Sequence, residues 1–403
     1  MAKRYEQAER LRGVRYDVRG ANMVEAQRME AAGETILKLN IGNLAPFGFE
    51  TPEPVARSVV THLPESEGYS DSKGVLSARA AVADHYRQVG LDVGVETVWL
   101  GNGVSELIAM VMQCLVNPGD EVLIPAPDYP LWTGQTTLCG ARAVHYLCDE
   151  TNGWNPDVAD IAAKITPRTR AIVVINPNNP TGAVYSAPVV QQIVDLARAH
   201  DLVVLSDEIY EKIIYEGTHT YTATFTGDDV LCLTFSGLSK AYRACGYRAG
   251  WCAITGPLAA AAGLLEGLAL LANMRLCPNV PAQHAIQAAL EDRQSVDALC
   301  APGGRFHDQL TVAHEQLVQI PGVTCQPARG SLYLFPKLEP DVYPIEDDEV
   351  WALGLLRQQK ILVSHGRGFN WPHPDHFRLV ALPEEGVLVD AIGRIGDYLA
   401  TLR

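Results

Sequence analysis

Three polar side chains in the middle of the sequence each follow a short apolar run. Asn179 follows the first run, Asp207 the second and Lys240 the third. The runs are too short and too rich in β-branched residues to prefer helix, so they predict strands. They span residues 171–175, 202–205 and 230–235. Because open α/β sheets bind ligands beyond the carboxyl ends of their strands, we expect an amide, a carboxylate and an amine to meet in one crevice.

Two further features of the sequence suit an anion. Arg248 lies eight residues past Lys240, where the donor fork of its guanidinium can reach back toward the same crevice. The segment 101–106 reads G-N-G-V-S-E between a strand-like run and an apolar helix. Backbone amides and the helix dipole favour a phosphate at such a turn. The segment lacks the third glycine of a dinucleotide fingerprint, which argues against a nicotinamide dehydrogenase.

This set of groups matches what pyridoxal phosphate requires from a protein. Lys240 offers an amine for a Schiff base with the aldehyde, and Asp207 offers a carboxylate for the pyridine nitrogen. Asn179 and Tyr210 can donate to the phenolate oxygen, and Tyr129 can stack on the ring. We therefore predict Lys240, Asp207 and Tyr210 as catalytic residues within a larger cofactor-binding set.

The phosphate of this cofactor has its own candidate partners. Arg248 supplies a cation, and Ser239 supplies a hydroxyl next to the lysine. Val104 and Ser105 open the helix that follows the glycine turn. We predict that these residues bind the phosphate.

Each of these residue types also has an ordinary structural role. An aspartate after a strand often caps a helix. Asparagine is favoured in proline-rich turns, and most arginines form surface ion pairs. Only the combination of these residues at these spacings favours catalysis.

The joint pattern resembles the class I aminotransferases of pyridoxal-phosphate fold type I. Its parts are N-P-N-N-P-T-G at 176–182, S-D-E-I-Y at 206–210 and S-K-x-x-x-x-x-G-x-R-x-G at 239–250. The resemblance runs essentially from end to end. It is closest to the bacterial alanine aminotransferases, which exchange amino groups between alanine with pyruvate and glutamate with 2-oxoglutarate. The stretches that carry this closer resemblance are 16–20, 39–43, 68–74, 274–283 and 369–378.

The resemblance implies roles for further residues. Arg378 matches the arginine that holds the substrate α-carboxylate, and Gly42 matches the glycine whose backbone touches that group. Tyr69 matches the tyrosine that reaches the cofactor phosphate of the neighbouring subunit. The resemblance therefore implies a homodimer with shared active sites.

Two positions leave alternatives open. Where many relatives have a phosphate-binding serine, the chain has Gly237, so Ser239 or Ser236 is the candidate substitute. A second carboxylate, such as that of glutamate, would be bound by Arg19 in the N-terminal arm or by Arg275 of the partner subunit. An ordinary structural role is the alternative for both arginines.

The resemblance implies ping-pong transamination through a Lys240 Schiff base, with the freed amine moving the proton of the substrate Cα. One alternative is an aminotransferase for another amino acid, such as valine or an aromatic one. A second is a pyridoxal-phosphate lyase that cleaves a carbon–sulfur bond at the β position. A third is a ligand sensor in a transcription regulator, which needs a DNA-binding domain that we do not expect in the short N-terminal arm.

The elements that position these residues predict an α/β protein. Helices alternate with strands from about residue 74 to 255, which is typical of a mostly parallel sheet sandwiched by helices. The resemblance implies seven strands in that sheet. The later, mixed order of helices and strands predicts a smaller α+β domain. We expect an N-terminal arm at 1–45 that joins the small domain, a large cofactor-binding domain at 46–285 and the small domain at 286–403.

Within the small domain, the patterns predict several elements. Helices are expected near 303–319, near 347–359 and from 384 onward. Strands are expected near 361–364 and 377–382. We also expect a hairpin from 323 to 338 with Gly330 at its turn.

Composition narrows the setting of the protein. The net charge of −15 disfavours nucleic acid and anionic membranes as partners. The nine cysteines are scattered and odd in number, which predicts reduced thiols in the cytoplasm. The longest apolar stretch, 258–272, contains Glu266 and is shorter than the about 20 residues of a membrane span, so it predicts a packed helix. His365, His373 and His376 lack helical ligand spacing and are expected to be solvated rather than bound to a metal.

Overall fold

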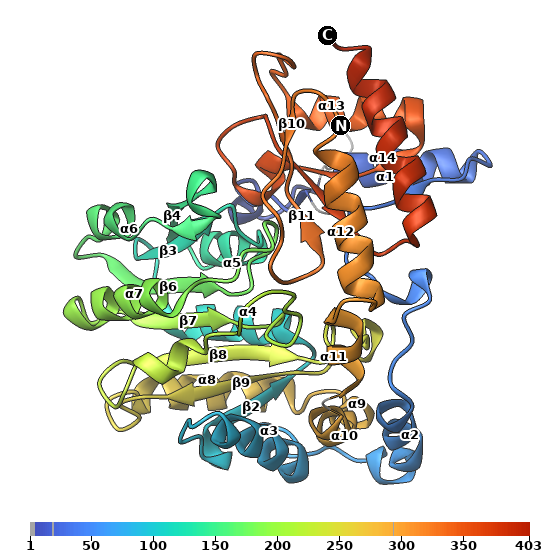
Figure 1. Ribbon diagram of the computed structural model, residues 1–403. Helices are drawn as coiled ribbons and strands as arrows, with labels where there is room; N and C mark the ends of the chain where they lie inside the picture. The colour runs from blue at the N-terminus through green and yellow to red at the C-terminus, as the bar shows by residue number, and fades with distance from the viewer. Residues whose placement is uncertain (1–4, 18–19, 293) are drawn as a thin grey trace.

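The computed structural model describes residues 5–17, 20–292 and 294–403. Its centre is a sheet with the strand order β2-β9-β8-β7-β6-β3-β4-β5, which crosses the lower half of Figure 1. The run from β4 to β8 is parallel, whereas β9 is antiparallel to β2 and β8, and β5 is antiparallel to β4. The strands are β2 (Val98–Gly101), β3 (Glu121–Ala126), β4 (Arg142–Asp149), β5 (Asn155–Pro156), β6 (Thr169–Ile175), β7 (Val203–Asp207), β8 (Cys232–Gly237) and β9 (Gly250–Thr255). The predicted α/β fold is confirmed, and the eighth strand is the two-residue β5 at the edge.

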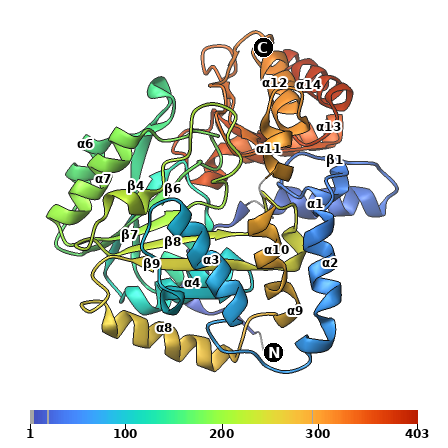
Figure 2. The ribbon, with the colours of Figure 1, turned by 60° about the horizontal axis from the view of Figure 1, so that its bottom comes forward.

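Both faces of this sheet are buried, because successive residues of a strand point into different hydrophobic clusters. Ile172 and Val174 of β6 pack in one cluster, and Val173 and Ile175 pack in the other. Helices on both faces are the usual cover of a parallel sheet. One face carries α3 (Leu76–Gln88), α6 (Val158–Lys164) and α7 (Ala187–Ala199), and the other carries α4 (Val104–Leu115), α5 (Leu131–Leu138) and α8 (Ala262–Arg275). Figure 2 shows α8 on the far side of the sheet from α6 and α7. The helix predicted from the apolar stretch 258–272 is confirmed as α8.

A separate hydrophobic cluster holds the small domain together. Its helices are α12 (Arg305–Leu317), α13 (Asp348–Gln359) and α14 (Glu385–Ala400). Its strands are β10 (Val323–Thr324), β11 (Tyr333–Leu334), β12 (Lys337–Leu338), β13 (Ile361–Leu362), β14 (Ser364–His365) and β15 (Phe377–Val380). The three helices and the strands expected near 361 and 377 are confirmed.

The N-terminal arm packs on the small domain. Its helix α1 (Ala21–Ala31) lies against α13, and its strand β1 (Leu37–Lys38) runs parallel to β13. The other helices are α2 (Glu53–Thr61), α9 (Val280–Gln283), α10 (Ala285–Glu291) and α11 (Gln294–Cys300). Among the described residues, no helix has the length and apolar character needed to cross a membrane.

The predicted hairpin from 323 to 338 is wrong in its turn. The ends do pair, with Val323 opposite Leu338 in β10 and β12. Gly330, however, forms an isolated antiparallel bridge with Ile214 of the large domain. The middle of the segment pairs with other parts of the chain, because β11 joins β15. The turn preference of glycine therefore did not decide the pairing of this segment. Long-range pairing that brings the two domains together decided it.

Candidate active site

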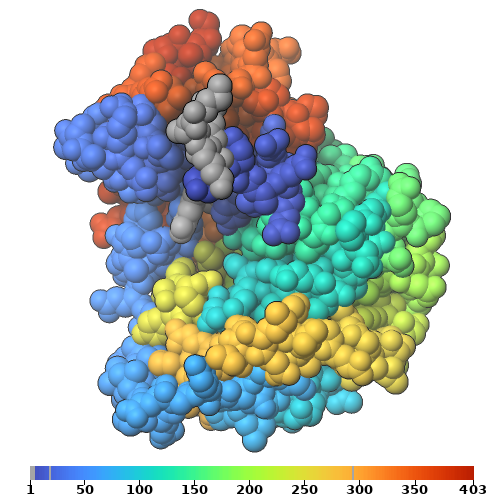
Figure 3. Space-filling view, turned by 180° about the vertical axis from the view of Figure 1, so that it is seen from behind, coloured from blue at the N-terminus to red at the C-terminus, as the bar shows by residue number. Residues whose placement is uncertain are grey.

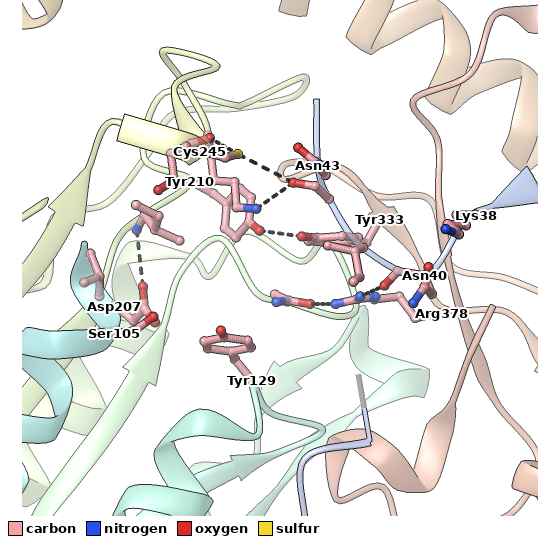
Figure 4. A pocket seen from close by; sticks show the side chains of 18 of the residues that line it. Lys38, Asn40, Asn43, Ser105, Tyr129, Asp207, Tyr210, Cys245, Tyr333 and Arg378 are labelled. Carbon is pink, nitrogen blue, oxygen red and sulfur yellow. Dashed lines mark hydrogen bonds between the residues drawn. The ribbon is translucent and has the colours of Figure 1, made fainter. Parts of the chain in front are cut away.

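A cavity of about 680 Å³ lies where the carboxyl ends of β6, β7 and β8 face the small domain and the N-terminal arm. This volume is in the usual range of small-molecule and cofactor sites. Of the predicted site residues that the structure describes, all except Tyr69 line the cavity, several of them labelled in Figure 4. They are Gly42, Val104, Ser105, Tyr129, Asn179, Asp207, Tyr210, Ser239, Lys240, Arg248 and Arg378.

Lys240 lies in the loop after β8, and its amine reaches the N-terminal arm. Its Nζ donates to the carbonyl oxygen of Gly42 at 2.8 Å. A side chain at position 42 has no room, because a Cβ there would lie 2.5 Å from the hydroxyl oxygen of Tyr333 and 3.4 Å from Lys240 Nζ. Glycine at this position therefore leaves space around the amine.

Asp207 is the last residue of β7 and is 3% exposed. The indole Nε1 of Trp132 donates to its Oδ2 at 3.1 Å, and the backbone N–H of Ile209 donates to its Oδ1 at 3.4 Å. Burial raises the pKa of Asp207 to about 6, while the hydrogen bond from Trp132 opposes this rise. A protonated ring nitrogen in the cavity would stabilise the ionised carboxylate.

Arg378 enters the cavity from β15 and is 2% exposed. Its Nη1 donates to Asn179 Oδ1 at 2.8 Å, and its Nη2 donates to the carbonyl oxygen of Asn40. Its Nε has no hydrogen-bond acceptor within the described chain. Burial lowers the pKa of Arg378, so the charged form is costly without a counter-ion. An incoming carboxylate would relieve that cost.

Two tyrosines separate the lysine from the buried arginine. The hydroxyls of Tyr210 and Tyr333 are 2.7 Å apart. The ring centroid of Tyr333 lies 4.3 Å from the guanidinium carbon of Arg378. Burial raises the pKa of Tyr210 well above its ordinary value, so its hydroxyl stays a hydrogen-bond donor at neutral pH.

Arg248 and the start of α4 form the cationic end of the cavity. Arg248 Nη1 donates to the carbonyl oxygen of Cys245 at 2.9 Å and lies 3.4 Å from Ser239 Oγ. Gly103, the N-cap of α4, has φ 80°, and a Cβ there would lie 2.1 Å from Arg248 Nη2. No side chain caps this helix end. Ser105 therefore shares a site with a guanidinium and free helix amides, which suits a phosphate.

The remaining predicted residues lie elsewhere. Of the two alternative serines, Ser236 does not line the cavity, because it is buried and donates to Glu211 Oε1 at 3.1 Å. Tyr69 lies outside the cavity and is 81% exposed. Arg275 Nη1 pairs with Glu106 Oε2 at 2.6 Å. Arg19 lies outside the described residues.

Of the three histidines predicted to be solvated, His373 is exposed as predicted, whereas His365 and His376 are buried. His365 is 5% exposed and pairs with Asp17 at 3.5 Å, and His376 is 1% exposed and pairs with Asp375 at 2.7 Å. The partner of His365 lies in the N-terminal arm, and the partner of His376 is the preceding residue. The spacing of apolar residues in the sequence does not reveal either pair. The described residues contain no cluster of three or more potential metal-ligating side chains.

Sequence reasoning missed several residues of the site. Trp132 follows Tyr129 by three residues in the same motif, so its contact with Asp207 had a weak signal. Tyr333 had none beyond its place in an apolar run. The other cavity residues that were not predicted include Tyr16, Met23, Lys38, Asn40, Ile41, Phe47 and Cys245.

Comparison with known proteins places this geometry in a family. The family model for aminotransferase class I and II matches residues 34–395. The chain belongs to this family. The aminotransferase is 57% identical over 401 residues to an alanine aminotransferase of Mycobacterium tuberculosis, covering 99% of this chain and 94% of the relative. It is 50% identical over 396 residues to the glutamate-pyruvate aminotransferase AlaA of Escherichia coli, covering 98% of each chain.

Solved structures agree with this assignment. An aminotransferase from Escherichia coli superimposes with a TM-score of 0.97 at 50% identity over 99% of both chains. An alanine aminotransferase from Pyrococcus furiosus superimposes with a TM-score of 0.93 at 34% identity, covering 98% of this chain and 100% of that one. The predicted resemblance to class I aminotransferases is thus confirmed.

Aminotransferases of this family depend on pyridoxal phosphate, and the residues in the cavity fit that cofactor. An amine, a buried carboxylate and a phenol line the cavity between the sheet and the small domain. A cationic end with an uncapped helix start is available for the phosphate. The predicted cofactor is therefore confirmed at the level of the family.

Proposed function

We propose that this aminotransferase exchanges an amino group between alanine with pyruvate and glutamate with 2-oxoglutarate. The relatives at 50–57% identity that carry alanine or glutamate-pyruvate aminotransferase names support this choice. The convergence of Lys240, Asp207 and Arg378 on one cavity carries the chemical part of the proposal. Together they supply an amine, a buried acid and a carboxylate-binding fork.

Bound pyridoxal phosphate supplies an aldehyde carbon for the substrate's amino group and a ring that takes up the charge left when the Cα–H bond breaks. Lys240 would hold the cofactor through its amine, and that amine would also take the proton from the substrate Cα. Asp207 would keep the ring nitrogen protonated. Trp132 keeps Asp207 oriented through the indole hydrogen bond.

The ring is held by the residues around it. Asn179 accepts from Arg378 through Oδ1, which leaves its Nδ2 to donate to the phenolate oxygen beside the Tyr210 hydroxyl. Tyr129 lines the same cavity and would stack on the ring. Arg248, Ser239, Ser105 and the backbone of Val104 would bind the phosphate.

The substrate carboxylate is held by Arg378. Its Nε has no acceptor among the residues that the structure describes, so the guanidinium can take the α-carboxylate of alanine or glutamate as a paired contact. The backbone of Gly42 closes this site from the arm. For the second carboxylate of glutamate, Arg19 is the proposed partner and Arg275 of the partner subunit the alternative. An Arg19→Ala variant is expected to lose more kcat/KM with glutamate than with alanine, and equal losses would remove the selective role.

We also propose a homodimer in which Tyr69 reaches the phosphate of the neighbouring subunit. The exposed face of α8 and the residue that follows it support this proposal, because Leu270 is 61%, Met274 73% and Leu276 51% exposed. Figure 3 shows α8 as a gold band across one side of the molecule. Single apolar residues on a surface are common, but a row of them is typical of an interface. Sedimentation of the purified protein tests the dimer.

A cytoplasmic location completes the proposal. All nine cysteines are free, which suits a reducing compartment.

An absorbance scan tests the activity. The purified enzyme is expected to show a cofactor band that shifts when alanine is added and returns when 2-oxoglutarate is added. Lys240→Ala is expected to lose this response and the borohydride-trapped link, whereas Lys164→Ala on the surface keeps both. A Lys240→Ala enzyme with full turnover would contradict the assignment. Assays with valine, aromatic amino acids and cystathionine separate the alternative substrates and the carbon–sulfur lyase.

A further inference from the structure

A buried polar cluster joins the large and small domains beside the cavity. Asp128 is 0% exposed and accepts from Asn370 Nδ2 at 2.7 Å and from the Thr133 hydroxyl at 2.8 Å. The backbone N–H of Asp128 donates to the carbonyl oxygen of Phe369 at 2.9 Å. Thr133 lies in α5 of the large domain, whereas Asn370 ends the 3₁₀ turn Gly366–Phe369 of the small domain. We call Asp128, Thr133 and Asn370 the interdomain latch.

One side of the latch is next to a residue of the cavity, and the other is next to a residue that packs against Arg378. Asp128 directly precedes Tyr129, which lines the cavity. Asn370 directly follows Phe369, whose ring centroid lies 4.5 Å from the guanidinium carbon of Arg378. The latch therefore links the proposed stacking ring, one peptide step from Asp128, to the proposed carboxylate fork, which contacts the neighbour of Asn370.

We propose that Asp128 and Asn370 are positioning residues that hold Tyr129 and Arg378 at the distance that substrate binding requires. The inference rests on the proposed function and adds two residues that do not touch the substrate. If the latch opens, Arg378 shifts relative to the cofactor ring. The affinity for the α-carboxylate then falls for amino acids and oxo acids alike, because both use the same fork.

The chemistry of the latch favours a role in fixing the geometry of the site over a role in stabilising the contact between the domains. Burying a polar pair brings little net stability compared with an apolar contact of the same size. A short directed hydrogen bond does fix a geometry, and here both carboxyl oxygens of Asp128 have a donor. Misplacing a substrate-binding group by about 1 Å can lower the rate by about a hundredfold.

Reversing the pair gives a sharp test. Asn370 has φ 57°, a left-handed conformation that asparagine and aspartate both tolerate. Asn370→Asp places two carboxyl groups against each other, whereas Asp128→Asn combined with Asn370→Asp restores one donor and one acceptor in the same space. Asn152→Asp, at an exposed position, is the matched control for the chemical change.

KM for alanine and for 2-oxoglutarate is measured for each variant, with kcat and urea unfolding measured in parallel. In Asn370→Asp both KM values are expected to rise about tenfold, the effect of losing one buried hydrogen bond. The reversed pair is expected to return both to near the wild-type values. Asn152→Asp is expected to change neither.

Unchanged KM values in Asn370→Asp, or a reversed pair that stays impaired, would overturn the latch. A lower urea midpoint with unaltered KM would also overturn it, because a purely structural role in holding the domains together predicts that result. A wild-type enzyme that does not respond to alanine would count against the proposed function instead. In that case KM is measured with whichever amino acid shifts the cofactor band. The double-mutant cycle in urea unfolding, from the two single variants and the double variant, then tests whether Asp128 and Asn370 interact.

Discussion

Trp132 and Asp207 form a buried hydrogen bond that joins helix α5 to the end of strand β7. The indole Nε1 lies 3.1 Å from Asp207 Oδ2, and the two side chains come from segments 75 positions apart. This bond opposes the burial that raises the pKa of Asp207 to about 6. The state of the proposed ring-nitrogen partner therefore depends on a residue that does not line the cavity.

Replacing Trp132 with phenylalanine is expected to weaken cofactor binding. The variant removes the only side-chain donor to Asp207 that the structure records, so the pKa of Asp207 rises further and less of it is ionised at neutral pH. Losing a hydrogen bond to a charged group costs about 1.5–3 kcal/mol, or roughly 10- to 150-fold in the cofactor Kd. Fluorescence titration of the apoenzyme measures this. Trp351→Phe is the control, because Trp351 is buried and its Nε1 has no acceptor.

Replacing Gly103 with alanine is expected to displace Arg248 and weaken binding of the phosphate. The new Cβ would lie 2.1 Å from Arg248 Nη2, so the guanidinium must move. Gly90→Ala is the matched control, because Gly90 also has a positive φ, 86°, but nothing lies within 4 Å of the added carbon. Both variants lose about 1 kcal/mol of unfolding free energy from backbone strain. Only Gly103→Ala should raise the Kd for pyridoxal phosphate, and a similar rise in both would refute the clash.

Arg378→Lys is expected to raise KM for alanine and for 2-oxoglutarate while cofactor binding changes little. Lysine keeps the charge but loses the planar fork and the contact with Asn179. We expect roughly a hundredfold increase in both KM values, from two charge-assisted hydrogen bonds of about 1.5 kcal/mol each. Steady-state kinetics measure it. Arg394→Lys, on helix α14 and paired with Asp390, should behave as wild type.

Asp128 should make the apoenzyme less stable as pH rises. Burial raises the pKa of Asp128 from 3.8 to about 7, so the folded state favours the protonated carboxyl. Its contribution to stability is therefore full below about pH 4 and is lost as pH rises toward 7. At one pKa unit per 1.36 kcal/mol, the total loss is on the order of a few kcal/mol.

The Asp128→Asn variant isolates this effect. The variant has no charge to bury at this position. The difference between its urea midpoint and that of the wild type should therefore increase in favour of the variant from pH 5 to pH 8. The titratable neighbours do not obscure the comparison, because burial lowers the pKa of His145 to about 4 and raises that of Cys148 to about 12. Burial also raises the pKa of Tyr146 well above its ordinary value. A difference between variant and wild type that stays constant over this range would contradict the prediction.

Local patterns in the sequence were enough to locate much of the cavity. Asn179, Asp207 and Lys240 each follow an apolar run, and a parallel sheet brings the carboxyl ends of such runs to one edge. Sequence patterns likewise indicated the sheet and the small-domain helices. The family resemblance added Arg378 and Gly42, both of which line the cavity.

Contacts between distant segments were decided only by the tertiary structure. The bond from Trp132 to Asp207, the pairing of Gly330 with Ile214 and the link between Asp128 and Asn370 leave no periodic trace, because each joins elements whose separation is set by packing. Burial is likewise a property of the whole fold. The sequence by itself indicated the amine, the carboxylate and the arginines of the cavity, because they follow local patterns and a family motif. The packing of the two domains determined the rest of the lining and the distances, protonation and partners of these groups.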